Sequence, residues 1–233
     1  MNDEATAPGT LEPSEGWAVL HLFYRLHGAF DGEAVRAAEE EARKSGHQVV
    51  SVAMLGHKAD VAFMALGPDL WALRRFQSAL SGAGLELVSS YVSLTDVSEY
   101  AKGVPEEMKQ ARLFPHLPPE GKKAFCFYPM SKRRGDKHNW FSLPYEDRKA
   151  LMYGHGAEGR KFAGRILQVV TGSTGLDDWE WGVTLFAVHP DDLKDCVYSM
   201  RFDEASSNYA EFGPFFTGMV GDLDEVLAQV AGQ

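Results

Sequence analysis

The order of predicted strands and helices constrains the fold of this chain more than any other feature. In the first half, apolar alternation and helix start and stop signals predict strand, helix, strand, strand, helix and strand, in that order. The strands span residues 17–25, 48–55, 60–66 and 85–94, and the helices span 33–45 and 69–80. This β-α-β-β-α-β order is the ferredoxin-like arrangement.

The second half repeats the same order of elements with different residues. Strands are predicted over 124–130, 165–171, 180–188 and 209–219, and helices over about 144–159 and 190–200, followed by a terminal helix over 222–230. Two such units are expected to place their sheets side by side, which makes the fold class α+β.

The segments around these units set the domain organisation. Residues 1–16 are acidic, contain proline and lack a hydrophobic stretch, so we expect a disordered lead rather than a signal peptide. The N-terminal unit spans 17–99, and the C-terminal unit, which carries the functional site, spans 122–233. The segment 100–121 contains four prolines and is expected to be a linker that covers the site.

The charge of the chain disfavours several classes of partner. A formal net charge of −10 argues against binding to nucleic acid or to an anionic membrane surface. Residues 122–137 differ from this background, with six basic residues against the single acid Asp136: Lys122, Lys123, Lys132, Arg133, Arg134 and Lys137. Such a run is typical of a solvated loop, but it also suits the mouth of a pocket for a small polyanion, and we expect the pocket.

The cysteines and the apolar runs bear on the compartment. No apolar run approaches the ~20 residues that span a bilayer. Cys126 and Cys196 both lie in apolar patterns and are expected to be buried free thiols, with a disulfide or a reactive site as the alternative. Reduced thiols and the absence of a signal peptide favour the cytoplasm.

His155 is the histidine most suited to chemistry, because Gly154 and Gly156 flank it inside a predicted helix. Each glycine costs about 1 kcal/mol of helix propensity, which makes sense where a flat ligand approaches the backbone closely. A helix kink is the alternative. The sequence has no zinc-like spacing of histidines or cysteines, but a haem iron needs only one axial ligand from the protein.

Several other residues suit redox chemistry on an anionic macrocycle. Tyr128, followed by Pro129, lies on a strand and is either a core tyrosine or an oxidisable residue lining a cavity. Lys132 falls just past the end of that strand. Arg160 and Arg201 lie in apolar patterns and need anionic partners, which are either protein carboxylates or a ligand.

The chain resembles the coproheme decarboxylases of the chlorite-dismutase-like superfamily. The similarity is densest in Cys-Phe-Tyr-Pro-Met-Ser-Lys-Arg-Arg at 126–134, Gly-Arg-Lys-Phe-Ala-Gly at 159–164, and the segments 168–183, 200–206 and 209–213. It extends from about Trp17 to the C-terminus and is weaker in the first half. The resemblance implies a dimeric α+β barrel of two ferredoxin-like units, assembled as a homopentamer.

The resemblance also implies roles for individual residues. His155 corresponds to the axial ligand of the haem iron, Tyr128 to a tyrosine that becomes a radical, and Lys132 to a lysine needed for the second decarboxylation. Five further positions correspond to residues that bind propionates or line the pocket: Arg112, Met130, Arg160, Arg201 and Ser206.

Gln168 distinguishes between activities within the superfamily. It lies thirteen residues after His155, where chlorite dismutases carry a distal arginine. An amide has no positive charge to hold chlorite near the iron, so Gln168 favours a decarboxylase. His116 remains a candidate for the distal base.

The activity that the resemblance implies is oxidative decarboxylation of Fe-coproporphyrin III (coproheme). Hydrogen peroxide would be the oxidant, two propionates would become vinyl groups, and the product would be haem b. Coproheme would be both substrate and redox centre, with a transient contact to the coproporphyrin ferrochelatase. Three alternatives stay open: a non-catalytic haem-binding or transfer protein, a dismutase-type haem peroxidase, and a structural protein that binds no porphyrin.

Overall fold

The computed structural model describes residues 9–101 and 103–232, in which the strands form one nine-stranded sheet. The first half supplies β1 (Ala18–Leu26), α1 (Gly32–Lys44), β2 (Gln48–Leu55), β3 (Val61–Gly67), α2 (Leu70–Gly82) and β4 (Leu85–Thr95). The second half supplies β5 (Ala124–Lys132), α4 (Tyr145–Arg160), β6 (Ile166–Gly172), β7 (Trp181–Ala187), α5 (Pro190–Met200), β8 (Ala210–Phe212) and β9 (Phe216–Gly221). The predicted order of elements is confirmed in both halves.

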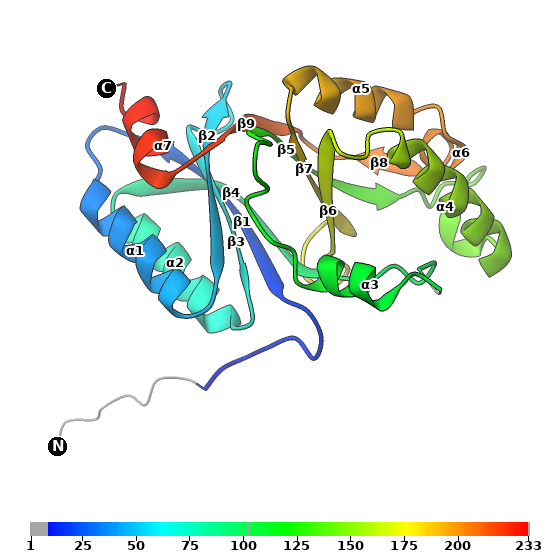
Figure 1. The fold of residues 1–233 in the computed structure, drawn as a ribbon, viewed down its shortest axis with the longest axis horizontal. Coiled ribbons are helices and arrows are strands. Elements are labelled where there is room, and N and C mark those ends of the chain that lie inside the picture. Colours follow the sequence, from blue (N-terminus) through cyan, green and yellow to red (C-terminus); the bar gives the residue numbers. More distant parts are fainter. Residues whose placement is uncertain (1–8, 102, 233) are drawn as a thin grey trace.

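The two ferredoxin-like sheets join edge to edge into a closed barrel (Figure 1). The strand order is β4-β1-β3-β2 in the first half and β6-β7-β5-β9 in the second, so the halves have matching topology. β4 pairs with β6 at one junction, and β2 pairs with β9 at the other. Closure removes the exposed sheet edges that an isolated ferredoxin-like unit would carry.

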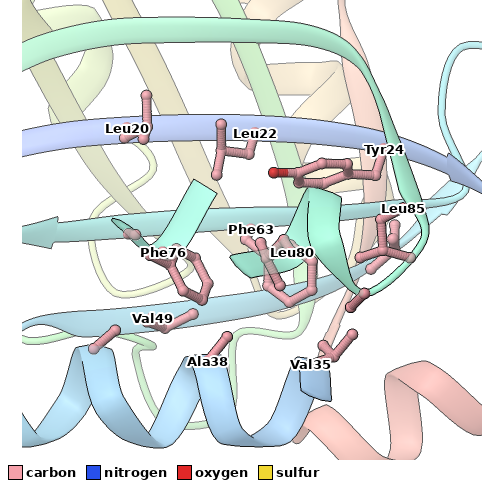
Figure 2. Close-up of a cluster of buried hydrophobic side chains, with 14 of the residues drawn as sticks. Leu20, Leu22, Tyr24, Val35, Ala38, Val49, Phe63, Phe76, Leu80 and Leu85 are labelled. Atoms are coloured by element: carbon pink, nitrogen blue, oxygen red, sulfur yellow. The ribbon is translucent and has the colours of Figure 1, made fainter. Parts of the chain in front are cut away.

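Strand alternation gives each half of the barrel two faces. On β1, Leu20, Leu22 and Tyr24 point to the helix side, whereas Val19 and Phe23 point into the barrel. Figure 2 shows the helix side, where Val35 and Ala38 of α1 and Phe76 and Leu80 of α2 pack against the first-half strands. The barrel interior is rich in aromatic side chains from both halves: Phe23, Tyr91, Phe125, Phe127, Phe186 and Phe216.

The predicted last strand over 209–219 is divided into β8 and β9, which is a correction. Gly213 and Pro214 interrupt it, since proline has no N–H to donate to a ladder and a Cβ at Gly213 would lie 2.7 Å from the Pro129 ring. β8 pairs with Met130–Lys132 of β5, whereas β9 pairs with its earlier part, so Pro129 lies where β5 changes partner.

The terminal helix packs outside the unit that precedes it in the sequence. The terminal helix α7 (Leu223–Val230) belongs by packing to the first half, because Val226 and Leu227 join the core beneath α1 and α2. Residues 1–8 of the expected disordered lead lie outside the described residues. Leu11, in the same lead, is anchored, because its N–H donates to Asp69 Oδ1 at 3.1 Å.

The linker over 100–121 contains a helix that the sequence analysis did not include, α3 (Glu106–Leu113). Two acidic residues in its first turn and Arg112 in its last turn suit the helix dipole. Leu113 is buried, and its carbonyl accepts a hydrogen bond from Thr95 Oγ1 at 2.8 Å. This contact fixes the end of α3 beside the β4–β6 junction, where Thr95 pairs with Thr171.

The expected cationic pocket mouth over 122–137 is wrong as a single cluster. Lys122 and Lys123 precede β5, whereas Lys132 ends it, so roughly 30 Å of strand separates them. Lys123 pairs with Glu225 at 3.5 Å, Arg133 pairs with Glu211, and Arg134 pairs with Glu180. Of these residues, only Lys132 is buried, and it lies on the outer face of the sheet.

Candidate functional site

The imidazole of His155 is held in a fixed orientation by the short helix α6 (Glu204–Ser207). His155 Nδ1 donates to Asp203 Oδ2 at 3.1 Å, and Ser206 Oγ lies 3.4 Å from the same nitrogen. Asp203 is also the N-cap of α6, where Oδ1 accepts from the Ser206 N–H at 3.2 Å. With Nδ1 donating to the carboxylate, the neutral imidazole carries its lone pair on Nε2, which is then the nitrogen available to a metal ion.

The carboxylate of Asp203 is suited to this task electrostatically. Partial burial by itself raises the pKa of Asp203, but hydrogen bonds from His155 and Ser206 outweigh it and hold the pKa below its ordinary value. Asp203 therefore stays ionised and can accept the hydrogen bond from Nδ1. Such a carboxylate–histidine pair is typical of metal-ligating histidines.

The helix that carries His155, α4, packs only loosely against the rest of the described chain. None of the sixteen residues of α4 is buried. A Cβ added at Gly154 or Gly159 would meet no atom within 4 Å, and one at Gly156 would meet only the Arg160 guanidinium at 3.5 Å. α4 runs without interruption through all three glycines. Packing within the protein therefore does not explain them, whereas close approach of a flat ligand would.

Tyr128 lies on the outer face of the second-half sheet. It alternates with the barrel-facing Phe125 and Phe127, and its ring stacks on Phe215 with centroids 4.6 Å apart. Burial raises the pKa of the Tyr128 phenol well above its ordinary value, and Arg201 opposes this effect. The phenol is therefore neutral and keeps its hydrogen at physiological pH.

The other predicted sheet residues share this outer face. In the row that contains Tyr128, Val183 of β7 lies between Tyr128 and Val170 of β6. Gln168 lies one row away, opposite Leu185. Gln168 and Val170 are exposed, so no described segment of the chain covers this part of β6. Met130 follows Tyr128 on the same face and packs against the same apolar cluster.

Lys132 links the sheet to the helix that orients His155. Its ammonium donates to the carbonyl of Ala205 in α6 at 2.8 Å and lies 4.3 Å from the centre of the Trp140 ring. Burial lowers the pKa of Lys132 to about 8, with Asp203 and Glu180 acting in the opposite direction. Since Lys132 and His155 both contact α6, the outer face of β5 and the His155 imidazole lie on the same side of the sheet.

Arg201 and Arg160 are exposed cations near this region. The Arg201 guanidinium lies 5.0 Å from the centre of the Phe212 ring and is close enough to lower the pKa of Tyr128. The Arg160 guanidinium lies 5.8 Å from the Tyr153 ring. Neither arginine forms an ion pair with a carboxylate within the part of the chain that the structure describes. Both are therefore available to an anionic ligand.

The two predicted linker residues are placed differently. Arg112 is exposed at the end of α3, whose last residue is fixed beside the β4–β6 junction. His116 is exposed, and its neighbours Pro115 and Leu117 hydrogen-bond to the side chain of Gln48 at the start of β2. Three strands separate β2 from β6 in the sheet order, so the structure does not bring His116 to Gln168.

The start of the linker closes onto the first turns of α4. Arg148 Nε donates to the Tyr100 hydroxyl at 2.9 Å, and Tyr100 stacks on Tyr145 with centroids 5.7 Å apart. On the other flank of α4, a groove of about 520 Å³ contacts Leu151, His155, Phe202 and Asp203. Tyr128, Met130, Lys132 and Gln168 are not among the residues that line this groove.

Sequence reasoning missed Asp203, although it lies inside one of the segments that carry the resemblance. Its signal is an N-cap pattern, Asp-Glu-Ala-Ser at 203–206, directly after the end of α5. The described residues contain no group of three or more histidine, cysteine or acidic side chains placed to hold a metal. A single imidazole with a carboxylate behind it instead suits one axial bond to a porphyrin iron.

The closed α+β barrel and the sequence of this chain match those of a known family. The family model described as chlorite dismutase matches residues 30–221, and the chain belongs to this family. Curated relatives named coproheme decarboxylase are 39% identical in Staphylococcus carnosus and 38% identical in Thermus thermophilus. These matches cover 90% and 97% of this chain, and 93% and 98% of the relatives.

Further relatives extend the comparison. A protein of Natronomonas pharaonis whose name refers to haem binding is 40% identical over 97% of this chain, which spans 42% of its length. The solved structure of a haem-binding protein from Thermus thermophilus superposes with a TM-score of 0.85 at 36% identity, covering 96% of this chain and 98% of that one.

Chlorite dismutase from Candidatus Nitrospira defluvii in complex with imidazole shares the fold, with a TM-score of 0.74 at 22% identity over 94% of this chain and 97% of that one.

Within residues 9–101 and 103–232, no helix has the length and apolar character required to cross a bilayer.

Proposed function

We propose that this chain is a coproheme decarboxylase, which converts two propionates of Fe-coproporphyrin III into vinyl groups and yields haem b with hydrogen peroxide as oxidant. One observation carries the proposal: His155, with Nδ1 held by Asp203, faces the same side of the sheet as Tyr128 and Lys132. The names of the two coproheme decarboxylases at 38% and 39% identity support it.

The substrate would lie between α4 and the outer face of β5, β7 and β6. His155 Nε2 would bind the iron on one side, and the exposed face of Gln168 and Val170 would line the other. Gly154 and Gly159 fit this position, because no atom of the described residues lies within 4 Å of the places their Cβ atoms would take, apart from the helix's own backbone. Gln168 carries no charge, so this side would not retain an anion such as chlorite.

Cationic side chains would hold the four propionates. Arg201, Arg160 and Arg112 are exposed, and Lys132 is close to α6. Met130 would contact the porphyrin edge. Ser206 was expected beside a propionate, but its position 3.4 Å from His155 Nδ1 also supports a role in orienting the imidazole. An arginine offers two parallel hydrogen bonds to a carboxylate, which would fix the orientation of the ring.

Tyr128 would transfer oxidising equivalents from the porphyrin centre to a propionate. When bound, the iron porphyrin would be the group that reacts with hydrogen peroxide. The neutral Tyr128 phenol would then give up an electron and a proton, and the phenoxyl oxygen would take a hydrogen atom from the propionate β-carbon. Loss of a second electron and of CO2 leaves a vinyl group, so one peroxide is reduced to two waters for each propionate. Lys132 would assist the second decarboxylation.

The assembly and cellular context belong to the same proposal. The enzyme would act as a cytoplasmic homopentamer and would receive coproheme through a transient contact with the coproporphyrin ferrochelatase. Light scattering of the purified protein measures the first of these points directly. A mass other than that of five chains would contradict it.

Mass spectrometry of the porphyrin after peroxide addition tests the proposed reaction. Wild-type protein loaded with coproheme should convert it to a product that has lost two carboxyl groups. Tyr128→Phe should bind coproheme with the same visible spectrum and release no CO2. Tyr198→Phe is the matched control, because Tyr198 is 64% exposed and should retain full turnover.

The outcomes separate the alternatives. Coproheme that stays intact in the wild type would indicate a binding or transfer protein. Full turnover by Tyr128→Phe would show that the decarboxylation proceeds without this phenol. Absence of any spectral change on mixing would exclude the porphyrin site itself.

A further inference from the structure

Two free thiols lie beside Tyr128. Cys126 precedes it by two residues on β5, so both side chains point to the same outer face, and both belong to one buried apolar cluster. Cys196 is a buried residue of α5, which packs on this face through Leu193 and Val197. Both thiols are close enough to influence the pKa of the Tyr128 phenol. Both cysteines are free and buried.

The surroundings of Tyr128 offer few other side chains able to give up a hydrogen atom. Its ring partners are Phe212 and Phe215, which are not readily oxidised. Met130 packs against the same cluster but has no S–H bond. Cys126 is therefore the described side chain of this cluster that can readily give up a hydrogen atom, and Cys196 lies on α5, the helix that packs over the cluster.

We propose that Cys126 and Cys196 form a radical sink for Tyr128, which discharges the phenoxyl radical when no propionate is in place to react. This inference rests on the proposed function, since it takes Tyr128 to be oxidised during turnover. The thiols would protect the enzyme during the interval after the second decarboxylation, when peroxide is still present but the two reacting propionates have been consumed.

Burial determines how these thiols can react. It raises the pKa of Cys126 to about 12, and it raises the pKa of Cys196 to about 11. At neutral pH both side chains therefore carry S–H and almost no thiolate. Direct attack on peroxide requires the thiolate, so this route is closed, whereas transfer of a hydrogen atom requires the S–H form.

The transfer step balances without any other reactant. The Tyr128 phenoxyl oxygen takes the hydrogen atom from sulfur, so an O–H bond forms, an S–H bond breaks and a thiyl radical remains. A small hydrogen-atom donor such as ascorbate returns the thiyl to the thiol. Without that donor, dioxygen adds to the sulfur, the resulting peroxyl radical takes a hydrogen atom from the other cysteine, and rearrangement leaves the first cysteine as a sulfinic acid.

Peptide mass spectrometry after exposure to excess peroxide in air tests the proposal. The samples are coproheme-loaded wild type, porphyrin-free wild type, loaded Tyr128→Phe, and loaded wild type with ascorbate. We expect Cys126 or Cys196 to gain two oxygen atoms in the loaded wild type, at least about tenfold more than in the other three samples. Met64, buried in the barrel core, serves as an internal control and should be equally modified in all four.

A second measurement uses the variant Cys126→Ala/Cys196→Ala. Its first turnover should match the wild type, but the number of turnovers before inactivation should fall several-fold as oxidation shifts to Tyr128 and to the porphyrin. A protein that unfolds in this form is replaced by the two single variants, each of which should give part of the same loss.

Several results would overturn the inference. Unmodified thiols in a wild-type sample that has released CO2 would reject the sink while leaving the decarboxylase proposal intact. Equal cysteine oxidation in Tyr128→Phe would show that oxidants reach the thiols by another route, and equal oxidation without porphyrin would show direct attack by peroxide. A wild type that binds coproheme but releases no CO2 would instead reject the proposed function.

Discussion

The helices α1 and α4 occupy the same topological position in the two halves, yet they contact their sheets in different ways. α1 buries Val35, Ala38 and Ala42 against the first-half strands, as Figure 2 shows for the first two. α4 buries none of its residues. It is held instead by polar contacts at its two ends, from Arg148 to Tyr100 and from His155 to Asp203.

This difference separates a structural half from a functional half. In the first half, apolar side chains of α1 and α2 fill the interface between helix and sheet. In the second half, polar anchors fix α4 while the outer face of β6 stays exposed at Gln168 and Val170. Under the proposed function, the repeated fold supplies a packed core in one copy and a binding face in the other.

The largest expected contrast is in core stability. Phe76→Ala, which removes a ring packed on Phe63 in the first half, should lower the free energy of unfolding by about 3–5 kcal/mol. Leu151→Ala in α4 should cost less than about 1 kcal/mol without porphyrin, because α4 has no buried side chain. Urea unfolding followed by circular dichroism measures both. Similar losses for the two variants would show that α4 is packed like its counterpart.

Acid should destabilise the barrel interior that the two halves share. His21 Nε2 lies 2.9 Å from Thr184 Oγ1 across the halves, and burial lowers the pKa of His21 from 6.5 to about 3. Below pH 6.5, His21 binds a proton in the unfolded chain but not in the folded chain. The free energy of unfolding therefore falls as pH decreases towards 3, by up to about 4 kcal/mol.

The control for this acid effect is His21→Leu, measured by urea unfolding at about pH 7 and about pH 4.5, on either side of the ordinary histidine pKa. The wild type should lose more stability than His21→Leu between these two pH values. An equal loss in both proteins would assign the acid sensitivity to other groups.

The rate of the second decarboxylation should depend on the protonation of Lys132. Its pKa is lowered to about 8, so the ammonium is charged below this pH and neutral above it. Attraction for a propionate is therefore lost as pH rises, and kcat/KM should fall by up to about tenfold per pH unit above 8. Stopped-flow spectra of the three-propionate intermediate give this profile. Lys132→Arg, which stays charged, should abolish the decline, and a decline that persists in this variant would exclude Lys132.

The smallest effect concerns the glycines beside His155. Gly154→Ala should raise the free energy of unfolding by about 1 kcal/mol through helix propensity, since the added Cβ meets no atom. The same change should weaken coproheme binding if the ligand lies against this backbone. Gly82→Ala at the end of α2 is the matched control, because its Cβ also meets nothing, and it should leave coproheme affinity unchanged. Equal coproheme affinity in both variants would show that coproheme does not lie against the backbone at Gly154.

Local patterns were sufficient to predict the order of elements in both halves, because helix caps and strand alternation depend on residues that are adjacent in the sequence. They could not place α7, whose Val226 and Leu227 are buried only because β9 pairs with β2 of the other half. They also gave one strand over 209–219, where the change of partner at Pro129 divides it.

The site shows the same limit. His155, Tyr128 and Lys132 stood out through glycine flanks, an adjacent proline and charge. Asp203 did not, because its importance comes from a contact with a residue 48 positions away. The prediction of one cationic cluster over 122–137 was wrong for a related reason, because the extended strand β5 separates the lysines before it from Lys132 at its end.

Hydrogen–deuterium exchange with and without coproheme tests the central contrast between the two halves most directly. If coproheme lies between α4 and the second-half sheet, its addition should slow amide exchange in α4 and β6 and leave exchange in α1 unchanged. Protection of α1, or unchanged exchange in α4 and β6 in a sample shown by its visible spectrum to contain bound coproheme, would contradict the account.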